Sequence, residues 1–154
     1  RYDAAIEAAR RTVEVHPKYT DGHAGLAFVL SFTGRFEEAL QAIRRAKELN
    51  PQYSYVYLAV EGRILFHLKK YNAALELIEE SILRNPVFDR TQLMLAAIYA
   101  ELGELDDAAW AVEEALTIRS DISLADERRD SNYKKPQDLN HYIDALRKAG
   151  VPEQ

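Results

Sequence analysis

Alanine and proline recur along this 154-residue chain with a period of 34 or 35 residues. The alanines that share the period are Ala5, Ala39, Ala74 and Ala108, and the prolines are Pro17, Pro51 and Pro86. Each alanine stands three residues after an aromatic residue or a leucine, and each proline follows a charged, helix-like stretch. A fixed period of this length indicates one supersecondary unit that is repeated and stacked along the chain.

Each period contains two helical patterns separated by a tight turn. In the first full unit, Leu26, Ala27 and Leu30 share one helical face, and small and branched residues share a face after the turn. We expect helices at 2–15, 20–33, 36–49, 54–68, 71–84, 88–102 and 105–118. No stretch alternates as a strand would, so the predicted class is all-α. An ordinary helical bundle is the alternative, but it would not require alanines and prolines at a fixed period.

This pattern resembles the tetratricopeptide repeat family, in which 34-residue helix–turn–helix units stack into a superhelix. The resemblance covers residues 1–120 and implies a right-handed α-solenoid. The predicted units are the second helix of a truncated repeat at 1–17 and full repeats at 20–53, 54–88 and 89–120. The sequence departs from the family where tryptophan is common, at His23, Leu58 and Gln92, and where an apolar residue is replaced, at Glu61.

The last 34 residues do not continue the repeat. Residues 121–136 carry mixed charge, so we predict a connecting loop with at most a short helical turn. Pro136 is well placed to begin a helix, and an apolar face follows within 137–149. We expect this helix to cap the open end of the last repeat, near Val112 and Leu116. The alternative is that it folds into the concave groove or meets another chain.

The closing residues 138–153 are also similar to the C-terminal ends of bacterial proteins that carry such repeats behind a signalling domain. Class III adenylate/guanylate cyclases are the example. This resemblance implies that the repeats form the C-terminal regulatory or docking portion of a larger bacterial protein. It carries over no catalytic residue.

Charge and residue types argue against several other classes of protein. The net charge is −5 and the pI about 5.4, which disfavours a general nucleic-acid binder. No apolar run approaches the roughly 18–20 residues that span a bilayer, so we predict no membrane segment. The absence of cysteine is compatible with the cytoplasmic location that we expect.

We predict neither a metal, nor a cofactor, nor an enzyme. The chain has no cysteine, and no two of its four histidines are three or four residues apart. Adjacent carboxylates on a helix point roughly 100° apart and do not converge on a substrate. The sequence also lacks a phosphate-binding glycine loop and a nucleophile elbow.

The first helix of each stacked pair lines the concave side, where repeat proteins bind their partners. In this family that side usually holds an extended or helical peptide. The candidate groove residues carried over from that geometry are Ala24, Phe28, Val60, Arg63, Phe66, His67, Arg90, Met94 and Ala97. An apolar floor with two arginines suits an amphipathic segment with an acidic anchor. The open alternative is that these side chains only pack helix against helix or face solvent.

Family members that grip the acidic C-terminus of heat-shock chaperones use a lysine, asparagine and arginine clamp on this surface. Only Arg90 retains a suitable charge here, so that function is disfavoured. Three further apolar residues are candidates for an interface, namely Trp110, Ile6 and Val13. Trp110 replaces polar residues of the sister repeats. Ile6 and Val13 lie on a first helix without its own partner, where we expect them to be partly bare.

The predicted function is therefore a non-catalytic scaffold that binds a protein or peptide partner in its concave groove. The alternative is a self-association or intramolecular regulatory module of a signalling enzyme such as a class III nucleotidyl cyclase. In that case a homo-oligomer would form through the N-terminal end.

Overall fold

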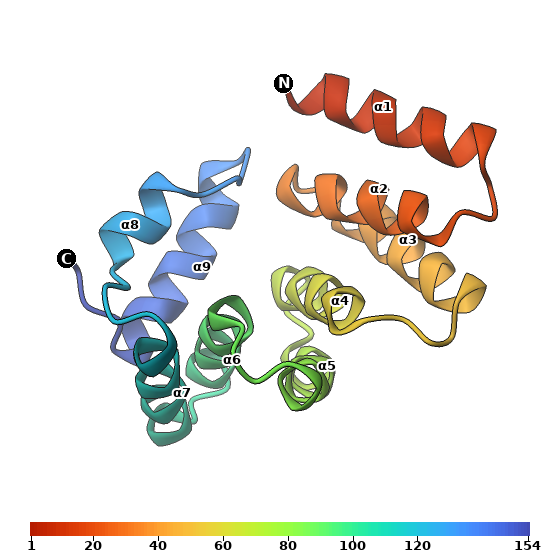
Figure 1. Ribbon diagram of the computed structural model, residues 1–154. Coiled ribbons are helices and arrows are strands. Elements are labelled where there is room, and N and C mark those ends of the chain that lie inside the picture. Colours follow the sequence, from red (N-terminus) through yellow and green to blue (C-terminus); the bar gives the residue numbers. More distant parts are fainter.

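The computed structural model describes residues 1–154 as nine α-helices without strands (Figure 1). The helices are α1 (Tyr2–Val15), α2 (Thr20–Phe32), α3 (Phe36–Leu49), α4 (Tyr55–His67), α5 (Tyr71–Arg84), α6 (Asp89–Glu101), α7 (Leu105–Ile118), α8 (Leu124–Arg129) and α9 (Pro136–Ala149). The predicted all-α class is confirmed. The expected bounds of the seven repeat helices agree with those of α1–α7 to within one residue at each end.

Helices α2 and α3, α4 and α5, and α6 and α7 form three successive hairpins. Each hairpin turns through a residue of positive φ, which is Gly34 (83°), Lys69 (61°) or Gly103 (79°). The next amide closes the preceding helix, as in the bond of 2.9 Å from the Lys70 N–H to the Leu65 carbonyl. The turn therefore has one geometry in all three hairpins, although a lysine occupies the glycine position of the middle one.

Small residues let the paired helices approach closely. Ala39, Ala74 and Ala108 are completely buried. A Cβ added to Gly62 would lie 2.5 Å from Ile78 Cδ1, so a larger residue at that position would have to displace the Ile78 side chain. The equivalent Ala5 of α1 is exposed.

The tail, residues 120–154, contains one helix that the sequence did not predict as a separate element. This is α8, which begins after Ser123, whose Oγ accepts a bond of 3.1 Å from the Asp126 N–H. Helix α9 packs mainly against α6 and less against α7, and buries Ile143 and Leu146 completely. The tail and the repeats share one continuous hydrophobic core.

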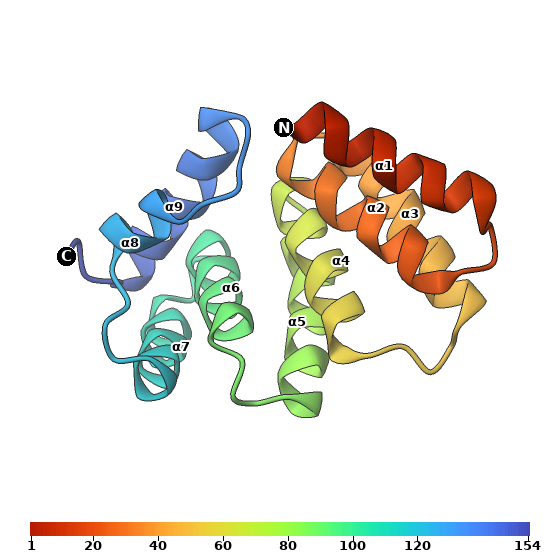
Figure 2. The same cartoon turned by 45° about the horizontal axis from the view of Figure 1, so that its top comes forward.

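The repeats follow an arc, and the tail stands at the far end of this arc (Figures 1 and 2). Helix α9 closes the last repeat, while the connection before it reaches back toward α1 and α2. Both positions that the sequence left open for the tail are thus partly occupied. The concave side of the array becomes a pocket with a wall on each side.

Candidate binding pocket on the concave side

The concave side contains a cavity of about 340 Å³. Helices α2, α4 and α6, the first helices of the three full repeats, line one side, and residues of the tail line the other. The apolar part of the lining includes Phe28, Phe32, Val56, Val60, Met94 and Tyr142. Small-molecule sites have volumes of roughly 300–1,000 Å³, so the cavity is large enough to hold a small ligand or a partner's side chain.

The wall formed by the tail is a short connection, residues 130–135, which we call the crossing segment. The Lys134 N–H donates a bond of 2.8 Å to the Phe32 carbonyl, at the end of α2. The Tyr2 hydroxyl donates a bond of 2.8 Å to the Asn132 carbonyl. These bonds join the crossing segment to the first two helices of the chain, about 100 residues or more away in sequence.

Tyr133 anchors the crossing segment in an aromatic cluster. Its hydroxyl forms a hydrogen bond of 2.7 Å with His67 Nε2, and its ring packs edge-on against Phe32. The His67 ring stacks on Phe36, and Phe66 stacks on His141 with ring centroids 4.3 Å apart. Phe66 and His67 therefore lie beneath the tail rather than on an open groove.

Burial fixes the protonation of this cluster. Burial, together with the neighbouring His141 and Arg63, lowers the pKa of His67 to about 2. The pKa of His141 is also lowered, mainly by burial. Both imidazoles are therefore neutral near pH 7, where His67 meets Tyr133 and His141 meets the Tyr71 hydroxyl at 2.9 Å.

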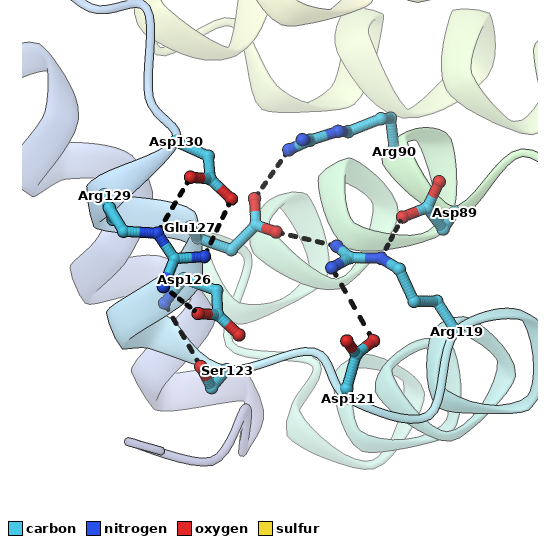
Figure 3. A network of polar contacts seen from close by, with 9 residues as sticks. All are labelled: Asp89, Arg90, Arg119, Asp121, Ser123, Asp126, Glu127, Arg129 and Asp130. Carbon is cyan, nitrogen blue, oxygen red and sulfur yellow. Dashed lines mark hydrogen bonds and ion pairs between the residues drawn. The ribbon is translucent and has the colours of Figure 1, made fainter.

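The two predicted groove arginines have different surroundings. Arg90 Nη1 donates a bond of 2.7 Å to Glu127 Oε2, and Arg119 binds the other oxygen of the same carboxylate at 2.9 Å (Figure 3). Arg63 Nη2 donates a bond of 2.7 Å to Ser31 Oγ, and no carboxylate lies within ion-pair distance of it. Its guanidinium carbon lies 4.1 Å from the centroid of the Phe32 ring, an arrangement typical of a cation–π contact.

The remaining predicted groove residues differ in their exposure and in whether they line the cavity. Phe28 is 44% exposed, whereas Val60 and Met94 are buried but reach the cavity. Ala24 is half-buried, and Ala97 is completely buried inside the core. The array therefore brings Phe28, Val60, Arg63, Arg90 and Met94 to one cavity and leaves the other candidates away from it.

The candidate interface residues also differ. Trp110 is 54% exposed on α7. Ile6 is buried, so the expectation that it is partly bare is wrong; it packs into the shared core, where α1 lies against α2. Val13 is half-buried. Tail residues that were not predicted also line the cavity, among them Glu127, Asp130, Tyr133 and Tyr142. The one signal in the sequence is that Tyr133 is an aromatic residue within a polar stretch.

Two models of the tetratricopeptide repeat match the sequence, one at residues 1–61 and the other at 60–122. The chain belongs to the tetratricopeptide repeat family. The matches cover the seven repeat helices and end before α8. They do not reach residues 138–153, whose resemblance to nucleotidyl cyclases stays a prediction. None of the helices is long and apolar enough to span a bilayer.

Solved tetratricopeptide structures share the fold. A crystal structure of MamA superposes with a TM-score of 0.71 at 20% identity, covering 96% of this chain and 86% of that one. TTC0263 of Thermus thermophilus gives 0.67 at 20% identity, with 94% and 73% covered. YrrB, described as having an unusual peptide-binding site, gives 0.65 at 15%, with 94% and 77% covered. No curated protein sequence matches the chain.

Proposed function

We propose that this tetratricopeptide array is a non-catalytic protein-interaction scaffold that binds an apolar segment of a partner protein on its concave side. The observation that carries the proposal is a pair of exposed apolar side chains on neighbouring repeats. Phe28 of α2 and Val56 of α4 are 44% and 42% exposed and both border the cavity. Repeat proteins bind partners on their concave surfaces, and clustered exposed apolar side chains mark such sites.

The crossing segment narrows the surface that a partner can use. It covers the part of the groove that Phe66 and His67 would line, because Tyr133 lies against His67. The accessible part runs along Phe28 of α2, Val56 of α4 and Phe88, the residue before α6. A partner segment of a few residues would fit this line better than a long helix. The membership of the family and the peptide-binding site named for YrrB support this mode of binding.

The test uses peptides selected from a random phage library on the purified chain. We expect isothermal titration calorimetry to show at least a tenfold loss of affinity when Phe28 and Val56 are both replaced by serine, because apolar anchors dominate interface energies. Trp110→Ser is the matched control, since it removes an exposed aromatic residue from α7 outside the cavity. Peptides that lose affinity for the control and keep it for the double variant would refute the concave site.

The alternative, self-association through α1, has one observation in its favour. Ala5 is exposed although Ala39, Ala74 and Ala108, its repeat equivalents, are completely buried. A second copy that covered this face would bury the same small-residue stripe. Sedimentation velocity over a range of concentrations tests this: a dimer that Ala5→Arg dissociates would support it, and a monomer throughout would exclude it.

A further inference from the structure

The cavity has a feature that a groove for a protein segment does not need. Arg63 lies in its wall with no carboxylate within ion-pair distance. Its Nε is buried without a hydrogen-bond partner, and its one side-chain bond goes to Ser31 Oγ. Buried cations are normally paired, so a guanidinium without a carboxylate partner can accept an anionic ligand.

The other charged groups of the lining are already paired. Glu127 accepts bonds from Arg90 and Arg119, and Asp130 accepts bonds from Arg129 Nε and Nη2 at 3.0 and 3.2 Å (Figure 3). These ion pairs balance the carboxylates of the cavity and occupy Arg90. Arg63 is thus the cation of the lining that has room for a further charge-assisted hydrogen bond.

Apolar side chains of the lining lie next to the Arg63 guanidinium. Phe28 and Phe32 lie beside the guanidinium, with ring centroids 5.3 and 4.1 Å from its central carbon. Val60, Met94 and Tyr142 add buried apolar surface. Burial also lowers the pKa of Arg63, and a bound anion would reverse that effect.

We propose that the cavity binds a small organic monocarboxylate, with its carboxylate on Arg63 and its apolar body among Phe28, Val60 and Met94. The crossing segment walls the cavity on the side opposite the repeats, which favours a free small molecule over an extended chain. The volume of about 340 Å³ suits a short aliphatic or aromatic acid. This site shares Phe28 with the surface proposed for a protein partner, but the proposal does not rest on that function.

The experiment compares three probes of one chain length: octanoate, octan-1-ol and octylammonium. We expect calorimetry to show one octanoate per chain, bound at least tenfold more tightly than the alcohol, because a charge-assisted bond is lost in the alcohol. Octylammonium should bind no better than the alcohol. Equal binding of octanoate and octan-1-ol would overturn the proposal, and so would binding at many equivalent sites.

Variants locate the site. Arg63→Gln should remove the difference between octanoate and octan-1-ol, whereas Arg90→Gln should preserve it, because Arg119 still holds Glu127. Ala59→Phe fills the cavity from α4, leaves Arg63 in place, and should abolish binding of all three probes. This variant keeps the test valid if Arg63→Gln fails to fold, as circular dichroism would show.

A fourth probe separates the two sources of an apolar carboxylate. An acetylated tetrapeptide that ends in leucine carries an apolar side chain and a free carboxylate on a polypeptide chain. The same peptide with an amidated C-terminus lacks the negative charge. Weaker binding of the peptide acid than of octanoate supports a small-molecule site. Tighter binding of the peptide acid, lost in the amide, would overturn the assignment to a small molecule.

Discussion

Two buried glutamates show how differently the repeat array and the tail are held together. Glu61 and Glu127 are both 4% exposed, and each is bound by two basic side chains. Glu61 of α4 takes its partners, Lys47 and Arg44, from the preceding helix α3. Glu127 of α8 takes Arg90 from α6 and Arg119 from the end of α7. The array is thus built from contacts between neighbouring helices, whereas the tail combines this contact with the last repeat with contacts to the distant helices α1 and α2.

The first test of this comparison is whether the tail and the array unfold as one cooperative unit. Ile143 of α9 and Ile78 of α5 are both almost fully buried in one shared core. Replacing either by alanine should lower the free energy of unfolding by about 2–5 kcal/mol. We expect urea unfolding followed by circular dichroism and by Trp110 fluorescence to shift equally in both variants. An Ile143→Ala variant whose Trp110 transition is unchanged would show that the tail is a separate unit.

Acidification should destabilise the chain at the aromatic cluster where α4 meets the tail. His67 has a folded-state pKa of about 2, below its ordinary value near 6.5, so below pH 6.5 the unfolded chain takes up a proton that the folded chain does not. The contribution of neutral His67 to the free energy of unfolding is therefore fully present above pH 6.5 and is lost as the pH decreases toward 2. Between pH 7 and pH 5 this amounts to about 2 kcal/mol. His141, in contact with His67 and with its pKa also lowered, acts in the same direction.

His67→Gln is the matched variant, because glutamine can still bond to the Tyr133 hydroxyl but does not titrate in this range. Urea denaturation at pH 7 and pH 5 measures both proteins. We expect the wild type to lose about 2 kcal/mol more than the variant over this interval. Equal losses would mean that the proton on His67 does not contribute, and that Tyr133 is not held by a neutral imidazole.

The helices of the array follow from the sequence because their determinants are local. The period of alanine and the turns at Gly34 and Gly103 fix each hairpin from residues within 35 positions of one another. Glu61, which replaces an apolar residue, still fits, because Lys47 lies 14 residues away on the adjacent helix. Each repeat needs only its neighbours, so a periodic pattern is sufficient to predict it.

The site follows from the sequence only in part, because one wall of it comes from the tail. Phe28, Arg63 and Met94 reach the cavity from repeat positions that the pattern identifies. Tyr133 does so through contacts with Phe32 and His67, each more than 60 residues away, and no local pattern encodes them. Phe66 and His67 were predicted to line an open groove for the same reason: nothing in their own repeat shows that the tail covers them.

Substitutions of Glu61 and Glu127 should have a smaller effect on the free energy of unfolding, but the region that each one destabilises should differ. Glu61→Gln and Glu127→Gln should each cost about 1 kcal/mol, because Arg44 and Arg90 are exposed enough to regain water when the carboxylate is neutralised. The expected difference lies in where the loss appears. Amide hydrogen exchange should accelerate in residues 130–135 of Glu127→Gln and between α3 and α4 of Glu61→Gln. Faster exchange of the crossing segment in both variants would mean that the two regions do not differ.

Trp110 should produce the smallest effect. It is the one tryptophan of the chain and lies 54% exposed on α7, away from the residues that line the cavity. Trp110→Ser should change the free energy of unfolding by less than about 0.5 kcal/mol, as surface substitutions usually do.

In the wild type, iodide should quench the fluorescence of Trp110 freely. Tyr133→Ala, which releases the crossing segment, should leave that quenching unchanged. Protection that grows with protein concentration would mean that a second copy covers α7. It would also move the self-association surface from α1, where Ala5 is exposed, to the opposite end of the array.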